Sequence, residues 1–373
     1  MFRFSVFCGG PGYFYKQEIY FNVKTYKFLL TSTLLIAFLI ITTSCGGEKK
    51  DMDWNWGDTP ENPSKPTPTP EPEVDANQYI LDAGWTNVTT LGTLPDYIKV
   101  FKAPTQLESK NAVAYIAVAD MNKATFNVIG KDGESKTPSE FYSQDKASVI
   151  INGGYFYWDD TNNKMVTASM ICRNSVVENP NIQYDGRDNW ATLYYPTRSI
   201  FAKSIEGKFS AEWCYTTTGN ITYTYPQPAP NKTGNTPLQA PSVAFPAGAS
   251  RFAGVTAIGG GPLLLKNGEI KNTYWEEIFD EGGVGPTSNN PRTAIGVTKD
   301  NRIILFVCEG RNKTPNVPGY TTEEVAKIMK SLACVDALNL DGGGSSCMLV
   351  NGKSTIKESD GSQRSVVTGI SLK

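Results

Sequence analysis

The chain has 373 residues, enough for one large domain or two ordinary ones, and its 35 basic and 37 acidic residues leave a net charge of −2. Because the basic residues form no long runs, the sequence lacks the electrostatic footprint of a nucleic-acid-binding protein. It also has no histidine, which excludes the usual general base of serine and cysteine hydrolases and the commonest zinc ligand. Acid–base chemistry must therefore use carboxylates, tyrosine, lysine or water.

The N-terminal part of the sequence predicts that the protein is exported from the cytoplasm. A short apolar run, 28–41, follows Lys24 and Lys27 and ends in small residues before Cys45. This pattern indicates a signal peptide over residues 1–45 with a lipobox-like end, so Cys45 is the predicted lipidation site and the chain would touch a membrane through that anchor alone. A conventional n-region begins at Val23, which suggests a translation start near residue 23. The alternative is a buried helix.

Residues 46–75 predict a spacer between this anchor and the folded part. The segment is polar and acidic at first and then rich in proline, and such sequences form extended, semi-rigid linkers. We expect a lipid-anchored protein of the cell envelope, in the outer membrane and facing either the periplasm or the surface, with one domain over residues 76–373.

Apolar runs separated by turn signals predict a sheet-dominated domain. The predicted strands are Ala112–Ala119, Thr125–Ile129, Ser148–Ile151, Ala257–Lys266, Thr293–Thr298, Arg302–Cys308, Ala337–Leu340 and Cys347–Val350. Asn267-Gly268 and Asn351-Gly352 are hairpin-turn signals. We therefore expect an α+β fold, a single mixed domain with a central β-sheet and a few packed helices.

The clearest helix is predicted over Thr322–Leu332. Thr321 and Glu324 have the spacing of a capping box, and the apolar residues that follow share one face. That face should pack on the sheet and belong to the core.

Residues 181–250 hold many prolines and aromatic residues with little periodicity, which indicates an insertion or an elaborated sheet rim. Trp190, Trp213, Tyr223 and Tyr225 could offer sugar-stacking faces, although ordinary packing is the simpler interpretation for each.

Five cysteines follow the linker without metal-ligand spacing, and an odd number cannot all form disulfides. Three of them, Cys308, Cys334 and Cys347, lie in or beside apolar runs. We predict mostly buried thiols.

Glycine-rich or charged segments directly follow several predicted strands, where binding residues tend to be held by a rigid sheet. They are Asn152-Gly153-Gly154, Gly260-Gly261-Pro262, Pro291-Arg292-Thr293-Ala294-Ile295-Gly296, Glu309-Gly310-Arg311 and Asn339-Leu340-Asp341-Gly342-Gly343-Gly344-Ser345-Ser346. Successive glycines allow backbone to approach a ligand and can point amide groups at an anion. Asp341 combines a carboxylate with such an amide- and hydroxyl-rich turn.

These five motifs occur in an order that resembles the phosphodiester glycosidase domain, a family that includes the enzyme uncovering mannose 6-phosphate. The resemblance extends over roughly Ala112–Lys373. It implies hydrolysis of a sugar-1-phosphodiester or phosphorylated glycan. Glu309 stands where many relatives have Asp, and the segment 312–320 is longer than usual, so the reaction class transfers better than the substrate.

The resemblance and the residue types together suggest a division of labour. The predicted catalytic residues are Asp341 or Glu309, as base, nucleophile or stabiliser, with Asn152 orienting sugar or water. The predicted phosphate ligands are Arg292, Arg311, Gly342, Gly343, Gly344 and Ser345. Further substrate contacts are expected from Gly153, Gly154, Gly260, Gly261, Thr293 and Asn339.

Three alternatives stay open at this point. The sequence identifies no certain cofactor, but Asp341 and Glu309 could hold a hard cation such as calcium with glycine carbonyls as further ligands. The chain could be a glycan-binding lipoprotein without turnover. It could also be a structural envelope protein in which the arginines and carboxylates form a buried charge network.

Overall fold

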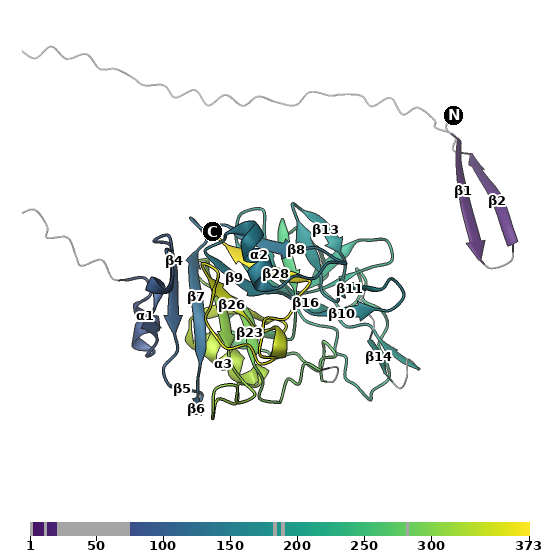
Figure 1. Ribbon diagram of the computed structural model, residues 1–373. Helices are drawn as coiled ribbons and strands as arrows, with labels where there is room; N and C mark the ends of the chain where they lie inside the picture. The colour runs from purple at the N-terminus through teal and green to yellow at the C-terminus, as the bar shows by residue number, and fades with distance from the viewer. Residues whose placement is uncertain (1–2, 11–12, 21–74, 182–184, 188–190, 281–282) are drawn as a thin grey trace, which may run out of the picture. The chain divides into compact units, whose positions relative to one another are not determined.

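The computed structural model describes residues 3–10, 13–20, 75–181, 185–187, 191–280 and 283–373 (Figure 1). The predicted signal-peptide apolar run, Cys45, nearly all of the linker and Trp190 lie outside these residues. The chain divides into two units, Met1–Thr69 and Pro70–Lys373. In the first, β1 (Arg3–Gly10) pairs antiparallel with β2 (Tyr13–Tyr20).

Among the described residues, no helix combines the length and the apolar character needed to cross a membrane.

Three antiparallel sheets form most of the second unit, which confirms the sheet-dominated α+β class but divides the expected central sheet. The eight-stranded sheet has the order β22 (Glu269–Ile270), β21 (Leu263–Lys266), β25 (Cys334–Asn339), β23 (Arg292–Thr298), β24 (Arg302–Cys308), β7 (Ala114–Asp120), β4 (Ile98–Lys102) and β3 (Thr86–Asn87). The seven-stranded sheet has the order β13 (Val176–Asn179), β12 (Ile171–Arg173), β20 (Thr256–Gly259), β16 (Arg198–Lys203), β17 (Phe209–Thr216), β18 (Thr222–Tyr225) and β19 (Ser250–Arg251).

The five-stranded sheet has the order β27 (Lys353–Ser354), β26 (Met348–Val350), β9 (Val149–Asn152), β28 (Thr368–Leu372) and β8 (Phe126–Gly130). Two-stranded hairpins complete the strands: β5 (Gln106–Leu107) with β6 (Lys110–Asn111), β10 (Phe156–Asp159) with β11 (Lys164–Thr167), and β14 (Asp185–Arg187) with β15 (Thr192–Tyr194). Both Asn-Gly dipeptides lie between paired strands, β21 and β22 in one case and β26 and β27 in the other, as predicted.

The main hydrophobic core draws side chains from one face of each of the three sheets. In β24, Ile303, Leu305 and Val307 belong to this core. The alternate residues Ile304, Phe306 and Cys308 face a second core on the other side of the sheet. The sequence of a strand that is buried on both faces is a continuous apolar run, and β24 could be predicted for this reason.

Helices cover the outer faces of two sheets. The helices are α1 (Gln78–Asp82), α2 (Pro138–Asp145) and α3 (Thr322–Ser331). The predicted capping box of α3 is present, because Thr321 accepts from the Glu324 amide and Glu324 from the Thr321 amide. Figure 1 shows α3 against β23, and its apolar face packs in the second core as expected. α2 packs on the five-stranded sheet.

One predicted strand is wrong. Ala257–Lys266 was expected to be continuous, but β20 ends at Gly259 and β21 begins at Leu263, in a different sheet. Gly260 and Gly261 form the crossing, and a Cβ atom at Gly260 would lie 2.4 Å from the Asn339 carbonyl oxygen. Periodicity could not reveal the break because residues 257–258 and 263–265, on its two sides, are both apolar and buried.

The segment 181–250 supplies strands to the middle of a sheet, since β16, β17 and β18 are neighbours in the seven-stranded sheet. Trp213 and Tyr225 are buried there and cannot act as sugar-stacking faces. The five cysteines after the linker are all buried and free, as predicted.

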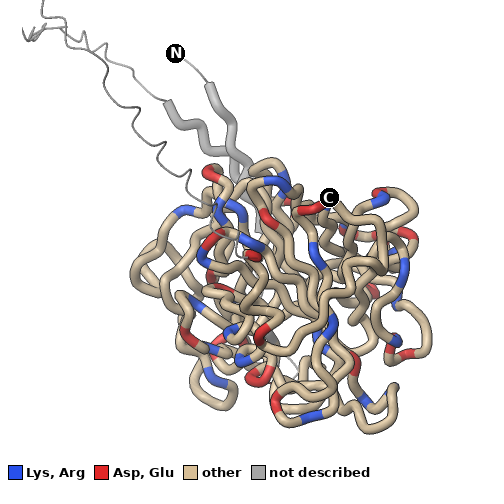
Figure 2. The backbone as a smooth tube through the Cα atoms, turned by 90° about the vertical axis from the view of Figure 1, so that its left-hand side faces the viewer, with Lys and Arg blue, Asp and Glu red and all other residues tan. Residues whose placement is uncertain are grey.

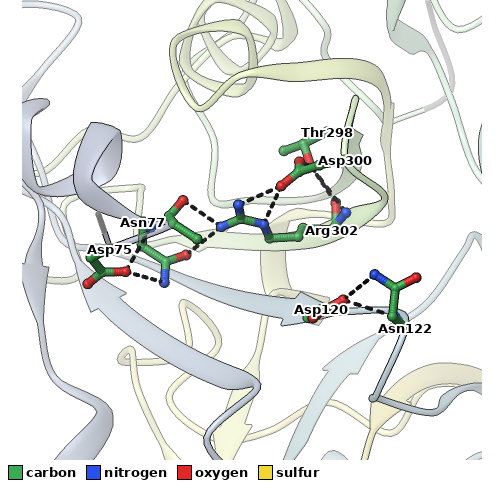
Figure 3. Close-up of polar contacts among 8 residues, drawn as sticks. Asp75, Asn77, Asp120, Asn122, Thr298, Asp300 and Arg302 are labelled. Carbon is green, nitrogen blue, oxygen red and sulfur yellow. Dashed lines mark hydrogen bonds and ion pairs between the residues drawn. The ribbon is translucent and has the colours of Figure 1, made fainter. Parts of the chain in front are cut away.

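The start of the second unit is tied to the eight-stranded sheet. Arg302 donates from Nη1 to the Ala76 carbonyl at 2.6 Å and to Asn77 Oδ1 at 3.1 Å (Figure 3). Its Nε donates to Asp300 Oδ2 at 2.6 Å. Residues 76 and 77 are therefore hydrogen-bonded to Arg302, the first residue of β24. In Figure 2, basic and acidic positions are interspersed along the backbone of this unit.

Candidate active site

The Asp341–Ser346 turn follows the end of a buried strand. β25 lies between β21 and β23, and Asp341 comes two residues after its last residue. The Asp341 amide donates to the Gly153 carbonyl at 3.1 Å, and the Gly343 amide donates to the Pro291 carbonyl at 2.9 Å. Residues 343–345 then form a short 3₁₀ turn. Three predicted motifs thus meet at one backbone junction.

The side chain of Asn152 fixes this turn through hydrogen bonds. Its Nδ2 donates to the Asp341 carbonyl at 2.7 Å, and its Oδ1 accepts from Thr293 Oγ1 at 2.8 Å and from the Cys347 amide at 3.1 Å. Asn152 and Thr293 are both buried, and neither lines the pocket described below. Instead of facing sugar or water, as the sequence suggested, these side chains fix the backbone that carries Asp341.

The glycines of the first two motifs serve close packing. A Cβ atom at Gly153 would lie 2.4 Å from Thr368 Oγ1, and one at Gly154 would lie 2.3 Å from the Gly259 carbonyl oxygen. The Gly261 amide donates to the Asn339 carbonyl at 2.8 Å. Gly153, Gly154, Gly260 and Gly261 therefore let the ends of the three sheets meet, and they lie behind the pocket wall.

Tyr155 connects these packed glycines to the pocket. Its hydroxyl donates to the Gly261 carbonyl at 2.6 Å and accepts from Asn339 Nδ2 at 2.9 Å. Burial, with the nearby Asp341 carboxylate, holds the pKa of Tyr155 far above its ordinary value. The phenol therefore stays neutral, and it was missed as a site residue although it directly follows the Asn152-Gly153-Gly154 motif.

A small pocket open to solvent adjoins the turn. Its described lining residues are Tyr155, Gly283, Val284, Asn290, Arg292, Arg311, Asp341, Gly342, Gly343, Gly344 and Arg364. Among them Asp341 is the single carboxylate, and three residues are arginines. This composition favours an anionic ligand.

Arg311 and Arg364 lie on two adjacent glycines of the turn. A Cβ atom at Gly343 would be 2.9 Å from Arg311 Nη2, and one at Gly344 would be 2.2 Å from Arg364 Nη2. Gly343 also has a φ of +58°, in the left-handed region that favours glycine. The glycines are thus needed so that both guanidinium groups can lie against the backbone of the turn.

Each of these two arginines is held by a polar partner. Arg311 donates from Nε to Asn290 Oδ1 at 3.1 Å, and its backbone adopts a φ of 55°, unusual outside glycine. Arg364 donates from Nε to Asp360 Oδ2 at 3.1 Å, and its Nη1 lies 3.5 Å from Ser345 Oγ. Arg364 was not identified from the sequence, because it stands alone in a polar segment far from every motif.

Arg292 has a different environment from the one expected for a phosphate ligand. Its Nε donates to the Tyr320 carbonyl, Nη1 to the Val284 carbonyl, and Nη2 to the Gly285 and Ser288 carbonyls, all within 2.9 Å. Burial lowers its pKa from the ordinary value. With four of its five N–H groups bound to carbonyls, Arg292 organises the segment 284–288 that forms one wall of the pocket.

The surroundings of Asp341 shift the pKa of its carboxyl group. Burial raises its pKa to about 6, while hydrogen bonds from Ser345 and the Gly342 amide and the charge of Arg364 act in the opposite direction. Its carboxyl group therefore changes charge near neutral pH, which suits a general base or acid.

Glu309 is not brought to this pocket. It is buried just after β24, its Oε1 accepts from the Lys357 amide at 2.9 Å, and it is absent from the lining residues. Within the described ranges, no three Asp, Glu or Cys side chains come together as a metal cluster. Of the two carboxylates in the calcium alternative, Asp341 lines the pocket and Glu309 does not.

The sequence signature of the family described as "Phosphodiester glycosidase" matches residues 145–373. This match includes the whole pocket. An uncharacterised SPbeta prophage-derived protein of Bacillus subtilis is 35% identical over 83 residues, which is 22% of this chain and 13% of that protein. The N-acetylglucosamine-1-phosphodiester alpha-N-acetylglucosaminidases of mouse and human are each 30% identical over 105 residues, 26% of this chain and 20% of theirs.

The chain thus matches at most a fifth of the length of these curated relatives. A crystal structure of a hypothetical protein from Synechocystis has a similar fold, with a TM-score of 0.50 and 16% sequence identity. The comparison covers 75% of this chain and 62% of that one.

Proposed function

The chain belongs to the phosphodiester glycosidase family, and we propose that it hydrolyses the glycosidic bond of a sugar-1-phosphodiester, releasing free sugar and a phosphate monoester. The observation that carries this proposal is a pocket lined by Asp341, the three glycines that follow it, Arg311 and Arg364. An anion bound by the two guanidinium groups would lie next to the carboxyl group.

The leaving group explains why one carboxyl group in the pocket is enough. A phosphate monoester is a far weaker base than a sugar alkoxide, so it departs without the strong general acid that ordinary glycosidases require. As the C1–O bond breaks, its electron pair passes to the phosphate oxygen. Arg311 and Arg364 would bind the phosphate in the substrate and remain paired with it as that charge develops.

Asp341 would act on the sugar side of the bond. Its ionised carboxylate can accept a proton from the attacking water, whose oxygen forms the new bond to C1. The same carboxylate could stabilise the positive charge on C1 or bond to it transiently. In each case the ionised form is required, so activity should increase as pH rises through about 6.

We further propose that the protein works at the cell envelope, attached through Cys45. The apolar run over 28–41 and the proline-rich spacer support this location. Its substrate would then be a phosphorylated glycan on or near the membrane.

Glycan binding without turnover is a second candidate, favoured by two exposed aromatic residues. Tyr157 and Trp158 lie in β10, which begins one residue after Tyr155, and are 52% and 48% exposed. Large exposed aromatic faces are suited to stacking on sugars.

One experiment separates the two candidates. The purified protein is incubated with alpha- and beta-linked sugar-1-phosphodiesters, and released sugar is measured for the wild type, Asp341→Asn, Arg311→Ala and Arg364→Ala. We expect Asp341→Asn to lose about 100-fold or more of the turnover. Arg251→Ala is the matched control, because Arg251 is exposed and lies outside the pocket.

If the wild type releases no sugar from any diester, the hydrolase proposal fails. Retained glycan binding in Asp341→Asn, lost in Trp158→Ala, would then support the binding protein.

A further inference from the structure

We propose that Glu309 is a positioning residue that anchors the loop carrying Arg364, and that it takes no part in proton transfer. The Arg364 loop is defined here as residues 355–365, between β27 and β28. The inference rests on the proposed function in one respect, because Arg364 is assigned there to the substrate phosphate.

Glu309 and Arg311 lie on either side of Gly310 and serve different elements. Arg311 lines the pocket, whereas the Glu309 side chain turns to the Arg364 loop and accepts from the Lys357 amide at 2.9 Å. Gly310 itself packs tightly, since a Cβ atom there would lie 2.4 Å from the Pro291 nitrogen. The backbone after β24 is therefore fixed, and one short segment carries Arg311 and contacts the Arg364 loop.

The Arg364 loop is attached at its two ends by different elements. At the near end, Glu309 binds Lys357, and the Thr355 amide donates to the Met348 carbonyl at 3.0 Å. At the far end, Gln363 Oε1 accepts from the Ser139 amide at 2.9 Å. Arg364 lies beside this far attachment, and its partner Asp360 lies between the two attachments and next to Gly344. The near attachment therefore acts on Arg364 through the position of Asp360.

The burial of Glu309 is inconsistent with contact to a substrate. Its side chain is 3% exposed, and Oε2 is buried without a hydrogen-bond partner among the described residues. A carboxylate that transfers a proton must reach the reacting atoms. Glu309 instead uses one oxygen for a backbone amide, a contact that a neutral glutamine can also make.

The first test compares Glu309→Gln with Glu309→Ala in steady-state kinetics on the cleaved diester. The Gln variant keeps an acceptor for the Lys357 amide, so its kcat and KM should stay within about threefold of the wild type, whereas a lost catalytic group costs about 100-fold or more. Glu309→Ala should raise KM about tenfold with little change in kcat, because ground-state and transition-state binding of the phosphate weaken together. Glu269→Ala, at an exposed glutamate distant from the loop, is the control.

Coupling to Arg364 provides the second kinetic test. If Glu309 acts through Arg364, Glu309→Ala should add less than about twofold to the KM of Arg364→Ala. A general structural role would leave the two effects additive. Additive effects, or a Glu309→Gln variant as inactive as Asp341→Asn, would overturn the proposal.

Hydrogen–deuterium exchange tests the anchoring without any substrate. Amides of residues 355–365 should exchange faster in Glu309→Ala but not in Glu309→Gln or Glu269→Ala, because local opening follows the loss of a buried hydrogen bond. Unchanged exchange in Glu309→Ala would refute the anchor even if the enzyme is active. Conversely, faster exchange in a protein that cleaves no diester would uphold the anchor while the proposed function fails. Should Glu309→Ala not fold, Glu309→Gln still decides between anchoring and catalysis.

Discussion

Replacing Asp341 with Asn should abolish turnover and at the same time stabilise the folded protein at neutral pH. Burial raises the pKa of Asp341 from 3.8 to about 6. The folded state therefore binds this proton more tightly than the unfolded state does. The wild type gains stability from that proton below pH 4 and loses it as pH rises through 6.

The expected magnitude follows from the size of the pKa shift. Roughly two units correspond to about 3 kcal/mol at most, since one unit is about 1.4 kcal/mol. Because Asp341 is partly exposed to the pocket, we expect a gain of about 2 kcal/mol for Asp341→Asn at pH 7.5. Asn resembles the protonated carboxyl group, so the difference between variant and wild type should fall below about 1 kcal/mol at pH 4.

Urea unfolding of both proteins at pH 4, 6 and 7.5 measures this difference, and the wild-type kcat/KM over the same range should rise through about pH 6. Asp145→Asn is a suitable control, because Asp145 bonds to Lys373 and lies outside the pocket. If Asp341→Asn is less stable than the wild type at pH 7.5, or if the difference does not shrink in acid, the assignment of a buried, proton-binding carboxyl group is refuted.

Three further changes test the packing around the pocket. Gly344→Ala would place a Cβ atom 2.1 Å from Asp360 Oδ2 and 2.2 Å from Arg364 Nη2. Steady-state kinetics should therefore show a KM about tenfold or more higher. The melting temperature, measured by calorimetry, should change little. Arg292→Lys should destabilise the fold by about 3 kcal/mol in urea unfolding, because an ammonium group cannot satisfy four separate carbonyls; an unchanged midpoint would argue against that role. Glu277→Ala should lower the free energy of unfolding by about 3 kcal/mol or more, since four buried hydrogen-bond donors lose the carboxylate that accepts from them. Glu276→Ala, at the neighbouring position, is the control.

Much of the architecture was determined by local sequence. The β24 strand and the α3 helix were predictable because burial on both faces gives a continuous apolar run and a capping box marks a helix start. The order of the glycine-rich motifs indicated the family, and Asp341 was placed at the end of a buried strand. These features depend on neighbours within a few residues, which is the range that periodicity and turn chemistry report.

The roles of the charged residues were decided only by the tertiary structure. Sequence could not show that the carbonyls of 284–288 and Tyr320 would take up the Arg292 guanidinium, or that Glu309 would face Lys357. Nor could it bring Arg364 beside Gly344, twenty positions away. Hydrogen bonds act over about 3 Å between groups that chain folding brings together. The sequence by itself therefore determined the framework and the carboxyl group, and the fold determined which arginines lie against the glycines beside it.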